Sequence, residues 1–148
     1  MICFTPILHE DVDALIAQEA LSTMYPWSMR NLSDSLDASA DCYLIRSRDV
    51  GLGYCVVNSV LDEAELLNLV IFKPFQSRGY GAEVMQELKQ KLADSGIKNW
   101  FLEVRASNTI AKSLYEKSGF IVLNTRRNYY RTSKQMKEDA FLMQCLLP

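Results

Sequence analysis

The sequence contains few of the residues that mark metal sites and disulfide frameworks. It has one histidine, His9, and four cysteines, none of them in a Cys-x-x-Cys pair. Structural zinc sites need closely spaced cysteine and histidine ligands, so this pattern predicts no bound metal. Cys42, Cys55 and Cys145 lie in apolar runs, and we expect them to be small buried side chains in a reducing compartment.

Neither sign of charge is in excess, and no long apolar run is present. There are 16 basic and 18 acidic residues, a net charge of -2, which disfavours a dedicated nucleic-acid binder. The densest apolar stretch, residues 66–72, is far shorter than the roughly 20 residues of a membrane helix. Residues 1–6 lack the basic and apolar regions of a signal peptide. We therefore expect a cytoplasmic protein that binds neither nucleic acid nor membrane.

What is present is an ordinary globular composition. The chain has 148 residues, of which 49% are hydrophobic and 23% charged. A chain of this length buries enough surface to need no disulfide or metal. We find no repeat, low-complexity tract or linker, and we expect a single domain over residues 1–148.

Hydrophobic periodicity predicts alternating strands and helices in a mixed order. Residues 64–72 are almost continuously apolar, which indicates a strand buried on both faces. Residues 49–51 are expected to form a hairpin turn, and Ser28 is expected to cap the second helix. The predicted strands cover residues 2–8, 42–47, 52–60, 64–72, 100–104, 120–123 and 140–146. The predicted helices cover residues 9–20, the segment after Ser28, 82–94 and 108–118. This order indicates an α/β (α+β) mixed sheet rather than a doubly wound parallel one.

A glycine-containing loop separates one predicted strand from an amphipathic helix. It reads Gln76, Ser77, Arg78, Gly79, Tyr80, Gly81, Ala82. Such a loop, with the amide groups at the start of a helix, suits a pyrophosphate. It matches neither the P-loop nor the three-glycine dinucleotide motif, and a strand–Gly-x-Gly–helix taken by itself is more often just a tight turn.

The whole heptad resembles the acyl-CoA pyrophosphate loop of the GCN5-related N-acetyltransferase (GNAT) superfamily, and the predicted order of elements is similar to that of the superfamily. The resemblance implies acetyl-CoA as co-substrate. It also implies a mostly antiparallel sheet of about seven strands with about four helices. That sheet is splayed between its fourth and fifth strands, where the pantetheine arm lies.

Further motifs narrow the resemblance. Residues 25–28 read Tyr-Pro-Trp-Ser, 103–108 read Glu-Val-Arg-Ala-Ser-Asn, 114–120 read Leu-Tyr-Glu-Lys-Ser-Gly-Phe, and 126–130 read Arg-Arg-Asn-Tyr-Tyr. Together with residues 60–64 and 138–140 they resemble the ribosomal-protein-alanine N-acetyltransferases. That family acetylates the N-terminal alanine of a small-subunit ribosomal protein.

The resemblance implies a role for each matching residue. Glu103 matches the general base and Tyr115 the general acid, while Asn108 matches a side chain that binds acetyl-CoA. Leu69, Val70 and Ile71 match the family's strand whose backbone pairs with the pantetheine. Residues 76–82 match the family's pyrophosphate loop. The residues themselves leave structural roles open: Glu103 as a solvent-facing strand residue, Asn108 as a helix cap and Tyr115 as a core aromatic.

The chemistry of these residue types suits direct acetyl transfer. An α-amine titrates near about 8, so a carboxylate such as Glu103 has only mild deprotonation to perform. A strand N–H near Val70 or Ile71 would stabilise the oxyanion, and the Tyr115 hydroxyl would reprotonate the departing thiolate. No acyl-enzyme is needed, so we expect the cysteines to serve packing.

Other readings stay open from the sequence. They are a small-molecule amine N-acetyltransferase of the same fold, a catalytically silent acyl-CoA-binding module and an interaction domain that does not bind CoA. Tyr25, Trp27, Tyr129 and Tyr130 either line the acceptor groove or fill the core. Arg126 and Arg127 are expected to form a solvated basic edge, and residues 131–137 to overhang the groove.

Overall fold

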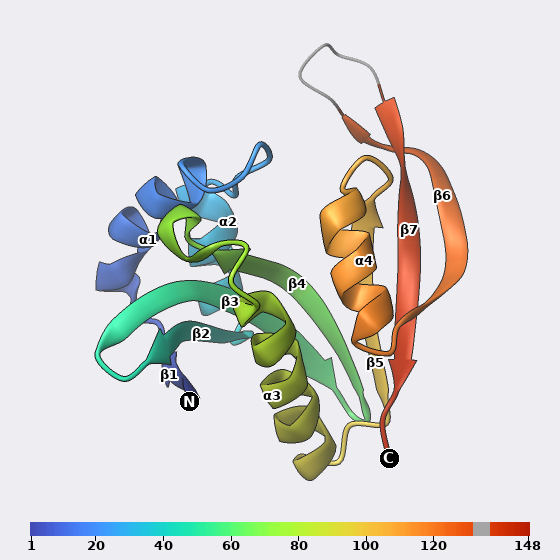
Figure 1. Ribbon diagram of the computed structural model, residues 1–148, viewed down its shortest axis with the longest axis horizontal. Helices are drawn as coiled ribbons and strands as arrows, with labels where there is room; N and C mark the ends of the chain where they lie inside the picture. Colours follow the sequence, from blue (N-terminus) through green and yellow to red (C-terminus); the bar gives the residue numbers. More distant parts are fainter. Residues whose placement is uncertain (132–136) are drawn as a thin grey trace.

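The computed structural model describes residues 1–131 and 137–148 and consists of one twisted sheet with helices on both faces (Figure 1). The strands are β1 (Ile2–Pro6), β2 (Asp41–Ser47), β3 (Val50–Val60), β4 (Glu63–Ile71), β5 (Asn99–Arg105), β6 (Ile121–Arg131) and β7 (Lys137–Leu146). The α-helices are α1 (Val12–Ala20), α2 (Met29–Asp37), α3 (Tyr80–Asp94) and α4 (Thr109–Lys117). Two short 3₁₀ turns, η1 (His9–Asp11) and η2 (Lys73–Phe75), join them.

The sheet order is β1-β2-β3-β4-β5-β7-β6, and every neighbouring pair is antiparallel except β4 and β5. The parallel β4–β5 pairing covers only Glu63–Asn99 to Leu66–Leu102. Past that point β4 continues to pair with β3 while β5 continues to pair with β7, and the two strands diverge (Figure 1). The predicted mixed, splayed sheet is confirmed.

Two apolar cores lie on opposite faces of the sheet. On one face α3 buries Val84, Met85 and Leu88 against Trp100 and Leu102 of β5. On the other face α1 and α2 cover the first half of the sheet. The buried residues of this second core include Val12, Leu15, Leu32, Cys42, Tyr54, Val56 and Val70. The alternation along β5 is regular, since every second residue from Trp100 is buried. The intervening positions are therefore available for polar side chains.

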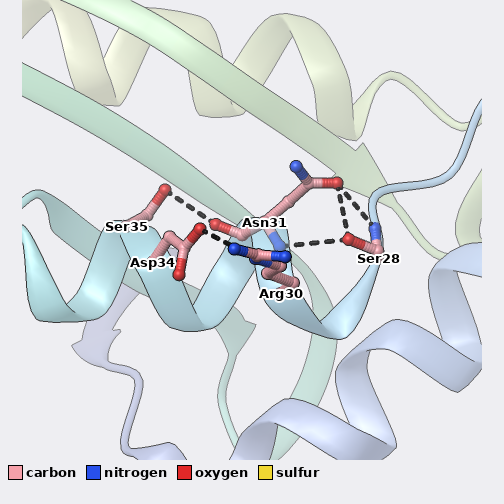
Figure 2. A network of polar contacts seen from close by, with 5 residues as sticks. All are labelled: Ser28, Arg30, Asn31, Asp34 and Ser35. Carbon is pink, nitrogen blue, oxygen red and sulfur yellow. Dashed lines mark hydrogen bonds and ion pairs between the residues drawn. The ribbon is translucent and has the colours of Figure 1, made fainter.

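The second helix is anchored at its N-terminus by reciprocal hydrogen bonds, as the sequence predicts. The Asn31 N–H donates to Ser28 Oγ (3.1 Å), and the Ser28 N–H donates to Asn31 Oδ1 (2.9 Å) (Figure 2). Ser35 Oγ donates to the Asn31 carbonyl, and Arg30 faces Asp34 one turn on (Figure 2). Capping of this kind contributes about 1 kcal/mol and fixes where the preceding loop ends.

Several predicted boundaries were wrong. The β2–β3 turn lies at Arg48 and Asp49, so β3 starts at Val50. Helix α3 begins at Tyr80, inside the glycine loop, because Gly79 supplies the N-cap. The final hairpin is longer than predicted, from β6 (Ile121–Arg131) to β7 (Lys137–Leu146). Most of the loop expected to overhang the groove, residues 132–136, lies outside the described residues.

The predicted burial of residues 64–72 on both faces was also wrong. In β4 only Ala64, Leu66 and Val70 are buried, and Leu67 is 39% exposed. The strand lacks a partner on one edge past Leu66, and its register with β3 shifts between Val56 and Val57, where Asn68 and Leu66 are paired and Leu67 is skipped. The apolar side chains left uncovered line a cleft.

Candidate active site

A cleft of about 1230 Å³ opens where β4 and β5 diverge. It is lined by residues 66–71 of β4, residues 102–105 of β5 and residues 108–111 and 113–115 around α4. The α1–α2 connection and the glycine loop complete its walls. Its volume exceeds the range of about 300–1,000 Å³ that is usual for a single small ligand. There is room for an extended cofactor and a second substrate.

Nearly all the predicted site residues share this cleft. Those that line it are Glu103, Tyr115, Asn108, Leu69, Val70, Ile71, Gln76, Ser77, Gly79, Tyr80, Gly81 and Ala82. Arg78, the remaining residue of the predicted set, is exposed and does not line the cleft. Residues up to 50 positions apart in the sequence thus line one cleft, which exists because two neighbouring strands diverge.

Glu103 lies at the apex of the separation. Leu102 is the last β5 residue paired with β4, so Glu103 is the first position whose neighbour on that side is the cleft. Its side chain is 19% exposed, and its Oε1 lies 3.2 Å from Arg126 Nη1. Arg126 is exposed, as predicted for a solvated edge, but its guanidinium also pairs with the carboxylate of Glu103.

Tyr115 projects from α4 toward the same cleft. Its ring packs against Phe120, with centroids 6.1 Å apart, and joins the α3–α4 core. Burial of the hydroxyl, together with the nearby Tyr130, raises the pKa of Tyr115 from 10.0 to about 12. The phenol is therefore neutral over the physiological range and is a donor rather than an acceptor of protons.

The glycine loop turns its amide groups toward the cleft. Ser77 and Gly79 both have left-handed backbones, with φ of 62° and 86°. The first hydrogen bond of α3 runs from the Glu83 N–H to the Gly79 carbonyl (3.2 Å). The amides of the helix's first turn, residues 80–82, have no carbonyl inside the helix to bind. These three residues line the cleft, and amides at the positive end of a 15-residue helix are chemically suited to an anion.

Gln76 ties the loop to the body of the protein. Its Nε2 donates to the Ile71 carbonyl and to the Ser22 carbonyl, each at 2.9 Å. Ser22 Oγ in turn accepts from the Lys73 N–H (3.0 Å). Both amide hydrogens of Gln76 are thus engaged by backbone, which gives this residue a positioning role in the loop.

The edge of β4 past Leu66 has no neighbouring strand on the side of the cleft. The Phe72 N–H donates to the Leu52 carbonyl of β3 (2.8 Å). Because N–H directions alternate along a strand, Val70 also points to β3, whereas Leu69 and Ile71 point to the cleft. The N–H of Ile71, rather than that of Val70, is the one available to a ligand.

Asn108 caps α4 as expected, since its Oδ1 accepts from the Ala111 N–H (3.2 Å). The carbonyl oxygen of the side chain is used by this bond. For a ligand in the cleft, Asn108 has its amide N–H groups and the second lone pair of Oδ1 to offer.

An arginine stacked between two tyrosines closes one end of the cleft. The Arg105 guanidinium lies 3.9 Å from the ring centre of Tyr25 and 4.1 Å from that of Tyr130. Tyr25 belongs to the α1–α2 connection and Tyr130 to β6, so the stack joins the two sides of the cleft. Tyr25, Trp27 and Tyr130 all line the cleft, while Tyr129 is 50% exposed and does not.

Sequence reasoning missed a buried polar cluster at the base of the cleft. Glu19 of α1 is 1% exposed and accepts hydrogen bonds from the Tyr54 hydroxyl and from Asn68 Nδ2 (3.0 Å). Asn68 also donates to the Tyr54 oxygen (3.0 Å). Within the helix predicted over residues 9–20, Glu19 follows Val12, Leu15 and Ile16 at helical spacing. The one available signal was a carboxylate in an otherwise apolar stripe.

The cysteines are suited to packing. Cys42, Cys55 and Cys145 are buried as predicted, and Cys3 is exposed. Burial, reinforced by the charge of Asp41, raises the pKa of Cys42 to about 11, so its thiol stays protonated near neutral pH. Within the described residues no group of three or more histidine, cysteine or acidic side chains is placed to hold a metal ion. In the same part of the chain no helix is long and apolar enough to cross a membrane.

An anion cradle, an open strand edge, a carboxylate and a neutral phenol in one cleft are the parts needed for acyl transfer from a thioester to an amine. Comparison with known proteins agrees. The acetyltransferase (GNAT) family profile matches residues 9–120, and the chain belongs to this family.

The relatives place the chain within that family. A protein of Haemophilus ducreyi named ribosomal protein bS18-alanine N-acetyltransferase is 33% identical over 95% of this chain and 97% of its own length. The crystal structure of the ribosomal-protein-S18-alanine N-acetyltransferase from Escherichia coli superposes with a TM-score of 0.88 and 29% identity, covering 99% of this chain and 94% of that one. The chain is thus a member of the ribosomal-protein-alanine N-acetyltransferases.

A more distant structure shares the fold. A GNAT family acetyltransferase from Elizabethkingia anophelis, solved with acetyl-CoA bound, has a TM-score of 0.75 at 20% identity and covers 99% of this chain and 97% of its own. The fold of this chain is therefore one in which another member carries acetyl-CoA.

Proposed function

We propose that the protein is an acetyl-CoA-dependent Nα-acetyltransferase that acetylates the N-terminal alanine of a small-subunit ribosomal protein. Glu103 is the general base and Tyr115 the general acid. The observation that carries this proposal is the single cleft in which both side chains meet the glycine loop and the open edge of β4. The names of the relatives support the choice of acceptor.

The co-substrate is held by backbone more than by side chains. Its pyrophosphate meets the amides of residues 80–82 and the left-handed turn at Ser77 and Gly79. The pantetheine arm extends β4 at the groups of Leu69 and Ile71 that face the cleft. This arrangement brings the thioester to the point where β4 and β5 diverge, beside Glu103.

Transfer proceeds in one displacement. Glu103 accepts a proton from the acceptor's α-ammonium, directly or through a water, and the free amine attacks the thioester carbonyl. The Ile71 N–H stabilises the oxyanion. The new C–N bond forms and the C–S bond breaks. The adduct nitrogen loses its second proton to solvent, the thiolate takes the proton of the Tyr115 hydroxyl, and Glu103 releases its proton to solvent. Tyr115 is then reprotonated from solvent, and the high pKa of Cys42 is consistent with transfer that uses no cysteine.

The proposal is tested by Glu103→Gln and Tyr115→Phe. Each should lower kcat by about 10²-fold while acetyl-CoA binding stays within about twofold of wild type, since neither side chain is needed to hold the co-substrate. Tyr43→Phe is the matched control, because Tyr43 packs against Phe4 and lies outside the cleft. Near-normal kcat in both variants would overturn the assigned roles.

A further inference from the structure

The proposed base is paired with an arginine of another strand. Glu103 lines the main cleft and also a smaller hollow of about 290 Å³, whose other lining residues come from β3, β4, β6 and β7 as well as β5. Arg126 is among the residues that line the smaller hollow and not among those that line the cleft, and its Nη1 lies 3.2 Å from Glu103 Oε1. The ion pair is thus made within the smaller hollow, by a residue outside the cleft lining.

The backbone of β6 is shaped to deliver this arginine. The β6–β7 register shifts between Arg126 and Tyr130, and Asn128 within the shift has a left-handed φ of 54°. The Asn128 N–H donates to Asp139 Oδ1 (3.0 Å), which stabilises the irregular segment. Strand irregularities of this kind redirect side chains beside active sites. The Tyr129 ring, 5.2 Å from the guanidinium carbon, holds Arg126 in place.

Other ionisable groups surround Glu103. Glu65 of β4 lines the small hollow with it, and Tyr130 of β6 and Tyr115 of α4 line the cleft. On its own strand Arg105 lies two positions on, stacked by tyrosines and within 4.0 Å of Glu138 of β7. The β7 residue directly opposite Glu103 is the apolar Leu142. Three acidic residues, Glu63, Glu65 and Glu103, therefore line one hollow, and Arg126 is the basic residue among its lining residues.

The effect of this sharing is visible at Glu65. Burial and the charge of Glu103 raise the pKa of Glu65, and Arg126 opposes the rise. Removing the arginine would leave two neighbouring carboxylates in a partly dry hollow, and one of them would bind a proton more readily.

We propose that Arg126 is a positioning residue that pairs with the Glu103 carboxylate and keeps it aimed into the cleft, beside the like charge of Glu65. The inference rests on the proposed role of Glu103 as the general base. Arg126 does not touch either substrate, and it transfers no proton. Its planar guanidinium fixes the carboxylate orientation, which a lysine ammonium does less well.

The first test is a ¹³C NMR titration of the Glu103 side-chain carboxyl, which needs no activity. Arg126→Gln should move its midpoint up by about one pH unit, and Glu65→Gln should move it down. Arg127→Gln is the matched control, since Arg127 is the exposed neighbour on the same strand. An unmoved midpoint in Arg126→Gln, with Glu103 folded as in wild type, contradicts the proposal.

The second test is the pH dependence of kcat at saturating acetyl-CoA and peptide. Arg126→Gln should lose up to about twofold more activity near pH 5.5 than near pH 8, because the extra protonation of Glu103 that a one-unit shift causes matters only at low pH. Arg126→Lys should restore the low-pH activity but not the full kcat. A uniform loss at all pH values, with no rescue by lysine, would indicate a purely structural role and overturn the proposal.

The two hypotheses fail differently. If Glu103→Gln remains active while Arg126→Gln moves the NMR midpoint, the ion pair is real and Glu103 is not the base. If Glu103→Gln is inactive and Arg126→Gln is unchanged in both measurements, the base is correct and the role of Arg126 is wrong.

Discussion

Glu103 and Tyr115 illustrate what local sequence predicts at the scale of single residues. Each lies in a motif that resembles the family, and each lines the cleft. The partner of Glu103 was not predictable in the same way. Arg126 looks like one member of an exposed basic pair, and only the register of β6 against β7 brings it to Glu103.

The hydrogen-bond partners of Glu19 could not be predicted from the sequence for a related reason. Its helical spacing correctly indicated a face directed at the core, yet its partners Tyr54 and Asn68 come from two strands far along the chain. A buried carboxylate is expected to have hydrogen-bond partners, but which residues supply them depends on tertiary structure.

The raised pKa of Tyr115 makes a signed prediction about pH. With a pKa of about 12, the hydroxyl stays protonated to higher pH than an ordinary tyrosine. The ratio of wild-type kcat to that of Tyr115→Phe should therefore stay constant from about pH 6 to about pH 10. A ratio that falls toward one near the upper limit, measured with a pH-stable peptide, would show that Tyr115 titrates normally.

At the scale of elements, the sequence predicted seven strands, four helices and their order, because apolar periodicity and caps are local signals. Boundaries failed where tertiary pairing decides them. The long β6–β7 hairpin includes polar residues such as Arg126 and Asn128, which no strand pattern favours. One edge of β4 is uncovered because β5 diverges from it. The apolar sequence of β4 is the same as that expected of a fully buried strand, so the exposure could not be predicted from it.

A tight approach of β3 to β4 gives the first element-scale prediction. A Cβ on Gly53 would lie 1.9 Å from the Val70 carbonyl oxygen, whereas one on Gly51 would meet only Leu44 at 3.9 Å. Gly53→Ala should lower the free energy of unfolding by about 3 kcal/mol, and Gly51→Ala by less than about 0.5 kcal/mol. Urea unfolding measures both, and equal values would contradict this packing.

The glycine loop gives the second prediction at the scale of elements. Gly79 and Gly96 have almost the same left-handed φ, 86° and 88°, and an added Cβ meets nothing within 4 Å at either position. Alanine should cost each about 1–2 kcal/mol of stability through backbone strain. Only Gly79→Ala should also weaken acetyl-CoA binding, by about tenfold or 1.4 kcal/mol, because Gly79 orients the amides of the cleft. Isothermal titration of the two variants distinguishes this role from strain alone, and equal losses of affinity would refute it.

On the scale of the whole molecule, the divergence of β4 and β5 divides the sheet into two halves and opens the cleft between them. The two halves of the sheet join through the short β4–β5 pairing, through the Arg105 stack and through the core under α3, which contains residues of both halves. The splayed sheet was predictable from family resemblance. The stack was not, because it brings together residues from the α1–α2 connection, β5 and β6.

The size of the cleft bears on the acceptor. After an extended co-substrate occupies β4 and the glycine loop, the end beside Tyr25, Trp27 and Tyr130 remains for the acceptor. Aromatic rings around a stacked arginine suit a peptide backbone and its first side chains better than a slim polycation, which the guanidinium would repel. The account therefore predicts a peptide acceptor.

The most direct measurement is acetyl transfer from acetyl-CoA to a peptide with the N-terminal sequence of ribosomal protein bS18, in competition with spermidine. The account predicts a single acetyl group on the α-amine, located by mass spectrometry, and a kcat/KM for the peptide about 10²-fold above that for the polyamine. Blocking the peptide's α-amine should abolish transfer. A higher kcat/KM for spermidine, or acetylation confined to side chains of the peptide, would contradict the central claim.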